Sequence, residues 1–150
     1  MTVWFDMDGT ISDLYAVPGW LSKLRAFDPS PYREAAPLCD FEKVLPILHE
    51  LQNLGVKIGI ISWCSKASTR EYDNAVRRAK KEWLRDYLPG FIFDEIHIVK
   101  YGTPKQTLSR RGGILIDDEA LNRERWTKGI SYDPNEKSIV EILQEILRNY

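Results

Sequence analysis

Two carboxylates follow a short apolar run near the beginning of the chain. The run Val3–Phe5 is succeeded by Asp6, Asp8, Gly9 and Thr10. A buried strand that ends in acidic residues brings them to the rim of a sheet, which is where ligands bind in α/β folds. There, one aspartate can attack an electrophile and the other can transfer a proton, provided that a metal ion offsets their mutual repulsion.

Other apolar runs also end at residues that suit this chemistry. Ser62 ends one run, and Asp117 and Asp118 follow another. Lys100 and Lys105 come after a third. Parallel strands would bring all of these side chains to one edge of the sheet. We expect the strands at Thr2–Asp6, Val56–Ser62, Glu95–Val99, Gly113–Asp117 and Ile130–Tyr132.

Helical patterns alternate with the expected strands. Apolar residues recur at helical spacing in three segments, Phe41–Leu51, Tyr72–Tyr87 and Ile139–Leu147. Asp40 is placed to cap the first of these helices, but Pro46 disfavours a regular first turn, so we expect that helix to begin at Leu45 or later. The alternation predicts an α/β fold in three layers, with a parallel five-stranded sheet between helices.

Residues 11–40 interrupt this alternation with a stretch rich in proline and aromatic residues. We expect a single domain over residues 1–150, in which this irregular insertion forms a small cap above the site. Trp20, Phe27 and Tyr32 either stack on a base of the substrate or pack the cap onto the core.

The set of residues suits phosphoryl transfer. Carboxylate oxygens of Asp6, Asp117 and Asp118, together with the carbonyl of Asp8, can hold Mg²⁺. Attack by Asp6 on phosphorus would give an aspartyl-phosphate, while Asp8 protonates the leaving oxygen and later activates water. Ser62 and a lysine would then donate hydrogen bonds to the phosphate oxygens.

These motifs resemble those of the haloacid dehalogenase (HAD) superfamily of phosphohydrolases. The resemblance rests on the stretch from Asp6 to Thr10, on Ser62, on Lys105 and on the pair Asp117-Asp118. It implies a Rossmann-like fold, an Asp6 nucleophile, an Asp8 acid/base and a Mg²⁺ cofactor. The motifs are most similar to the 5′(3′)-deoxyribonucleotidase branch and to small HAD proteins of bacteria and phages, which implies a phosphorylated small molecule, and specifically a nucleotide, as substrate.

Five residues are expected to bind the substrate: Gly9, Thr10, Ser62, Trp63 and Lys105. We favour Lys105 over Lys100 as the phosphate lysine because it precedes Asp117 at a spacing close to that of the family.

Two alternatives for the activity remain open. The first is a phosphatase with an open site that acts on polynucleotide ends or proteins, and the second is a HAD-like protein that binds phosphate or nucleotides without turnover.

A cysteine-based mechanism also fits one local pattern. Cys64 and Arg70 have the C-x5-R spacing of cysteine phosphatases, in which a thiolate attacks phosphorus. The loop contains no glycine, however, and this mechanism would leave the acids unexplained. We therefore expect Cys64 to be a small residue near the phosphate.

Composition limits the cellular compartments and the classes of partner that we expect for this protein. The 150 residues carry a formal net charge of −1, so no global positive field attracts nucleic acid or anionic membranes. The basic run Arg77–Arg85 is expected to form a solvated helix face. With two cysteines and no long apolar stretch, we expect no disulfide framework, no structural zinc and no membrane span. These features predict a cytoplasmic protein, or one of the host cytoplasm if it is viral.

Overall fold

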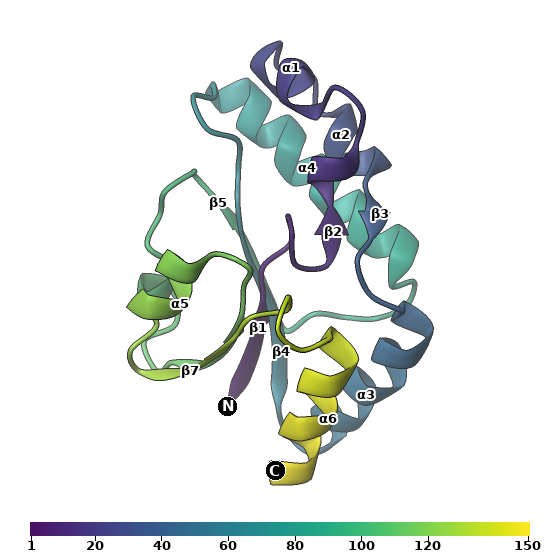
Figure 1. The fold of residues 1–150 in the computed structure, drawn as a ribbon, viewed down its shortest axis with the longest axis vertical. Coiled ribbons are helices and arrows are strands. Elements are labelled where there is room, and N and C mark those ends of the chain that lie inside the picture. Colours follow the sequence, from purple (N-terminus) through teal and green to yellow (C-terminus); the bar gives the residue numbers. More distant parts are fainter.

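A parallel five-stranded sheet forms the centre of the computed structural model, which describes residues 1–150 (Figure 1). The strand order is β5-β4-β1-β6-β7. The strands β1, β4, β5, β6 and β7 span Thr2–Phe5, Lys57–Trp63, Glu95–Val99, Gly113–Ile116 and Gly129–Tyr132, respectively. Each expected strand is confirmed within about two residues, and the predicted α/β architecture is correct.

Helices connect the strands and cover both sides of the sheet. The longer helices α3, α4 and α6 span Phe41–Asn53, Arg70–Tyr87 and Ile139–Asn149, and the shorter α5 spans Ala120–Arg125. A short 3₁₀ helix, η2 (Lys105–Leu108), precedes β6. None of these helices is both long enough and apolar enough to cross a membrane.

The two faces of the sheet are packed differently. Along β1, Val3 and Phe5 face the large core that α3 and α6 complete, whereas Trp4 faces a smaller cluster that includes Trp126. This alternation follows from the twofold period of a strand. In Figure 1 the sheet is seen nearly edge-on, with α3 and α6 on one side and α5 on the other. The three predicted layers are therefore present.

Helix α3 begins earlier than the sequence predicts. Asp40 accepts a hydrogen bond from the backbone N–H of Glu42 (3.1 Å), and the helix starts directly afterwards at Phe41. Pro46 lies inside the helix on its exposed side, where water can satisfy the carbonyl that loses its partner. The expectation of a start at Leu45 or later is wrong, because the cap and the buried apolar face outweigh one missing hydrogen bond.

The segment between β1 and α3 is more regular than expected. It contains a 3₁₀ helix, η1 (Leu14–Ala16), and two short helices, α1 (Trp20–Arg25) and α2 (Ser30–Glu34). Its ends are joined by an antiparallel pair of two-residue strands, β2 (Ser12–Asp13) and β3 (Ala36–Pro37). Figure 1 shows this segment beyond the carboxyl ends of the central strands, at the opposite end of the molecule from both termini.

Helix α4 joins this segment to the sheet. Its first half packs through Tyr72, Val76 and Ala79 against Leu14 and Tyr32. Its second half contributes Trp83 and Leu84 to the large core. One helix therefore fixes the position of residues 11–40 relative to the sheet edge.

The start of α6 offers a test of how much local capping contributes. Ser138 Oγ accepts a hydrogen bond from the N–H of Glu141, whose carboxylate in turn accepts one from the N–H of Ser138. We expect Ser138→Ala to lower the free energy of unfolding by about 0.5–2 kcal/mol, because it removes this cap. Denaturant unfolding measures the change. Ser138→Thr keeps the hydroxyl and is the matched control, and equal losses in both variants would contradict the capping argument.

Candidate active site

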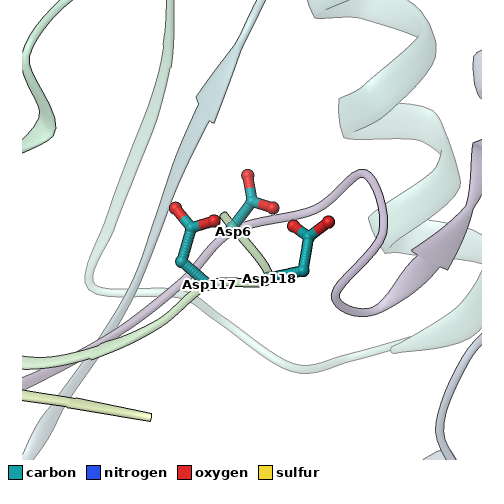
Figure 2. A group of neighbouring side chains, drawn as sticks. All are labelled: Asp6, Asp117 and Asp118. Atoms are coloured by element: carbon teal, nitrogen blue, oxygen red, sulfur yellow. The ribbon is translucent and has the colours of Figure 1, made fainter. Parts of the chain in front are cut away.

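Three carboxylates meet at the carboxyl edge of the sheet. Asp6 follows β1, and Asp117 and Asp118 follow the neighbouring strand β6. One carboxylate oxygen of each lies within 4.8 Å of the others. Figure 2 shows the three side chains converging above the strand ends. The parallel register of β1 and β6 thus assembles the acidic cluster that the sequence predicts.

Both carboxylate oxygens of Asp6 accept hydrogen bonds from other side chains. Lys105 Nζ donates to Asp6 Oδ1 (2.8 Å), and the hydroxyl of Thr10 lies 3.0 Å from Asp6 Oδ2. The side chain is only 10% exposed and borders the site cavity. Asp6 is therefore fixed in one orientation, with its carboxylate at the cavity wall.

Lys105, and not Lys100, reaches this cluster. Its ammonium group donates to Asp6 and also to Asp117 Oδ2 (2.7 Å), and its side chain is 2% exposed. Burial alone would lower the pKa of Lys105, but the two carboxylates outweigh it and raise the pKa above its ordinary value. A lysine has three N–H donors, so one remains available on the cavity side. Lys100 is exposed.

Asn122 is a site residue that the sequence analysis missed. Its side-chain amide donates to Asp117 Oδ2 (3.1 Å) and to Glu119 Oε2 (3.0 Å), and it is 5% exposed. The backbone N–H of Glu119 donates to Asp117 Oδ1 (2.9 Å). The only signal in the sequence is a polar residue on the inner side of the short helix α5, which has no distinctive spacing.

Thr10 and Gly9 organise the acids rather than lining the cavity. The Thr10 hydroxyl bridges Asp6 and Asp118, because its Oγ1 also accepts from the backbone N–H of Asp118 (3.1 Å). Gly9 has φ +80°, and a Cβ there would collide with the Asp118 carboxylate. Both residues border a different cavity, near the starts of α3 and α6. Their expected contact with substrate remains a prediction.

The expectation that the basic run Arg77–Arg85 is solvated is wrong for Lys80. This lysine is completely buried, although the run Arg77–Arg85 was expected to be a solvated face. Its ammonium donates to Asp8 Oδ2 (2.8 Å), Ser62 Oγ (2.7 Å) and the carbonyl of Trp63 (2.7 Å). The helical spacing of the sequence indicates that residue 80 lies on the buried side of the helix, since it comes four positions after Val76 and four before Leu84, which are both buried.

Asp8 and Ser62 are both partners of Lys80, but they differ in their access to the cavity. Asp8 borders the cavity, and its side chain is 18% exposed. Desolvation raises the pKa of Asp8 above its usual value, and Lys80 offsets only part of that rise. A raised pKa suits a carboxyl group that must carry a proton near neutrality. Ser62 is fully buried and does not border the cavity.

The cavity above the acids has a volume of about 470 Å³ and is walled partly by residues 11–40. Tyr15, Trp20 and Tyr32 line it from that segment, whereas Phe27 does not. Phe27 is 49% exposed and packs edge-on against Tyr72 instead. Trp63, which was expected to bind substrate, borders the cavity.

Cys64 does not have the environment of a nucleophile. The residue borders the cavity but is buried, and burial raises the pKa of its thiol. A raised pKa favours the neutral thiol, which is a poor nucleophile. Arg70, the second residue of the C-x5-R pattern, is exposed. The geometry therefore gives no support to a cysteine-based mechanism.

The carboxylate cluster fits a divalent cation. Its donors are all oxygens, which Mg²⁺ prefers. Burial and the negative charge of Asp6 raise the pKa of both Asp117 and Asp118. Lys105 is the sole cation within 4 Å of these carboxylates, so negative charge remains to be balanced. Asp6, Asp117 and Asp118 could therefore hold the ion through their side chains, whereas the carboxylate of Asp8 is engaged by Lys80.

A structural comparison identifies a protein with the same fold. The chain resembles D,D-heptose 1,7-bisphosphate phosphatase from Burkholderia thailandensis, with a TM-score of 0.56, 11% sequence identity and coverage of 97% of each chain. This likeness confirms the predicted three-layer, Rossmann-like α/β fold with its parallel five-stranded sheet. No protein-family model matches the sequence, and no curated protein does so either.

Cation binding can be tested without measuring activity. We expect Mg²⁺ at saturation to raise the melting temperature, by about 2–4 °C for each kcal/mol of binding energy linked to folding. Asp118→Asn should abolish most of this rise. It should also leave the metal-free protein at least as stable as the wild type, because it removes like-charge repulsion.

Differential scanning fluorimetry with and without Mg²⁺ provides the measurement. Glu124→Gln is the matched control, since Glu124 is an exposed acid outside the cluster. An unchanged Mg²⁺ shift in Asp118→Asn, or its loss in Glu124→Gln, would contradict the assignment.

Proposed function

We propose that this protein is a Mg²⁺-dependent phosphatase of the HAD type, which hydrolyses phosphate monoesters through an aspartyl-phosphate on Asp6. The observation that carries the proposal is the position of Asp6 at the cavity wall, held by Lys105 and Thr10 beside Asp117 and Asp118. The phosphatase activity named for the protein of the same fold agrees with this chemistry.

In the first step, a carboxylate oxygen of Asp6 attacks phosphorus. A new oxygen–phosphorus bond forms as the bond to the leaving group breaks, and Asp8 gives its proton to the departing oxygen. The remaining N–H of Lys105 donates to a phosphate oxygen, which stabilises the charge in the transition state. Lys105 also keeps the Asp6 carboxylate oriented toward the cavity.

In the second step, water hydrolyses the phosphorylated Asp6. Asp8, now a carboxylate, accepts a proton from the water as it attacks phosphorus. The bond between phosphorus and Asp6 breaks, inorganic phosphate leaves and the carboxylate of Asp6 is restored. Asp6, Asp117 and Asp118, with the carbonyl of Asp8, would hold Mg²⁺, which supplies neutralisation of the phosphate charge during both steps.

A nucleotide is the substrate that the cavity walls support best. Aromatic rings from two parts of the chain line it: Tyr15 and Trp20 belong to residues 11–40, and Trp63 and Tyr101 lie at or just after the ends of β4 and β5. Aromatic side chains stack on nucleobases with little regard for sequence. The volume of about 470 Å³ lies within the usual range for small-molecule sites.

The nucleophile can be tested by substitution. We expect Asp6→Asn to lower kcat for p-nitrophenyl phosphate by about 10⁴-fold, because an amide cannot form the aspartyl-phosphate. Steady-state assays with and without Mg²⁺ measure this loss. Cys64→Ser should retain activity within about tenfold. Activity that survives Asp6→Asn but disappears in Cys64→Ser would replace this mechanism with a cysteine-based one.

The substrate class needs a separate experiment. We expect Trp20→Leu to raise KM for a nucleoside monophosphate by about 5- to 100-fold, which is the worth of one stacking contact. Its effect on p-nitrophenyl phosphate should be much smaller.

Phe27→Leu is the matched control, because Phe27 belongs to the same segment but does not line the cavity. Equal effects of the two substitutions on KM would refute the stacking role of Trp20. Turnover of phosphorylated oligonucleotides but not of mononucleotides would favour a polynucleotide end as the substrate. Metal binding without turnover of any phosphate ester would favour a binding protein.

A further inference from the structure

We propose that Lys80 is a positioning residue that holds the carboxyl group of Asp8 in the orientation required for proton transfer to the leaving group. This inference rests on the proposed phosphatase function. Lys80 comes from the middle of α4, far in sequence from Asp8, and was not among the site residues that the sequence indicated.

The hydrogen bonds of Lys80 exclude a direct role in binding substrate. An ammonium group has three N–H donors. Asp8 Oδ2, Ser62 Oγ and the carbonyl of Trp63 accept them at 2.8, 2.7 and 2.7 Å, respectively. Lys80 is 0% exposed and does not border the cavity. Unlike Lys105, it has no donor left for a phosphate oxygen and acts through its partners.

Ser62 and the Trp63 carbonyl fix the ammonium group of Lys80 in place, and Asp8 is the group that Lys80 positions. Ser62 and the Trp63 carbonyl belong to β4, an interior strand, and are fixed by the sheet. Asp8 lies in the loop after β1, borders the cavity, and is bound by Lys80 through Oδ2. Its other oxygen, Oδ1, has no hydrogen-bond partner within the protein, and is therefore free to carry the proton. Without Lys80, the carboxyl group could rotate away from the leaving group.

The surroundings of Lys80 favour a rigid contact. The ring of Tyr32, from α2, lies 5.0 Å from the ammonium nitrogen, within the range of a cation–π interaction. Val76 and Leu84, one turn to either side on α4, are buried. These apolar neighbours keep water from competing for the ammonium group. The Lys80–Asp8 contact is thus shielded on the side where residues 11–40 pack against α4.

A series of leaving groups separates positioning of Asp8 from general structural damage. Release of p-nitrophenolate needs little help from an acid, whereas release of the more basic phenolate from phenyl phosphate needs protonation. We expect Lys80→Gln to lower kcat/KM for phenyl phosphate by about 100-fold, the usual contribution of a general acid. The loss for p-nitrophenyl phosphate should be below about fivefold.

A second readout follows from the role of Asp8 in hydrolysis of the phosphorylated enzyme. When that step is slowed, p-nitrophenyl phosphate should give a rapid burst of about one nitrophenolate per enzyme before the steady state. Stopped-flow absorbance measures this burst. Lys80→Gln keeps a hydrogen-bond donor at the site, and Lys80→Met serves as a second variant without one.

Lys81→Met is the matched control, because Lys81 is the exposed neighbour on the same helix. It should leave both substrates unaffected. Equal losses for the two aryl phosphates in a folded Lys80 variant, with no burst, would overturn the positioning role and leave Lys80 a structural counter-charge. A wild-type enzyme that hydrolyses neither ester with Mg²⁺ present would instead refute the proposed function on which this inference rests.

Discussion

Repulsion between carboxylates is the constraint on which this site depends. Two unit charges about 4 Å apart interact by about 4 kcal/mol at an effective dielectric constant of about 20, so a cluster of acids at one sheet edge opposes folding unless cations offset it. Two buried lysines provide that compensation, Lys105 for Asp6 and Asp117, and Lys80 for Asp8. Because Lys105 is the one cation beside the three carboxylates of Asp6, Asp117 and Asp118, negative charge is left over at this cluster, which suits a divalent ion.

The two lysines divide the acidic residues into two functional groups. Lys105 binds Asp6, the proposed nucleophile, and Asp117, a proposed metal ligand, and it retains a donor toward the cavity. Lys80 binds Asp8, and all three N–H donors of its ammonium group are used in hydrogen bonds within the protein. Attack and proton transfer would therefore be supported by different elements, η2 and α4. Damage to one can in principle be measured separately from damage to the other.

Helix α4 contacts both the segment that lines the cavity and the acids at the sheet edge. Its first half packs against residues 11–40, which supply Tyr15 and Trp20 to the cavity, and its second half is part of the sheet core. Lys80 lies at the junction of the two. The helix that packs against residues 11–40 therefore also carries the contact to Asp8.

The strands and most of the acidic site residues could be predicted from the sequence, because acids at strand ends and twofold or helical periodicity are local patterns. Asp6, Asp8, Asp117 and Asp118 were predicted from such patterns, whereas Lys105 was favoured over Lys100 because its spacing resembles that of the HAD motifs. The structure brings all five to one edge. The contacts of Lys80 and Asn122, and the burial of Ser62 away from the cavity, emerged from the tertiary structure instead. Lys80 was assigned to a solvated basic run, since the benefit of burying this lysine depends on the carboxylate of Asp8, 72 residues away in the chain. That long-range pairing has no local signature, and it is created when α4 packs across the ends of β1 and β4.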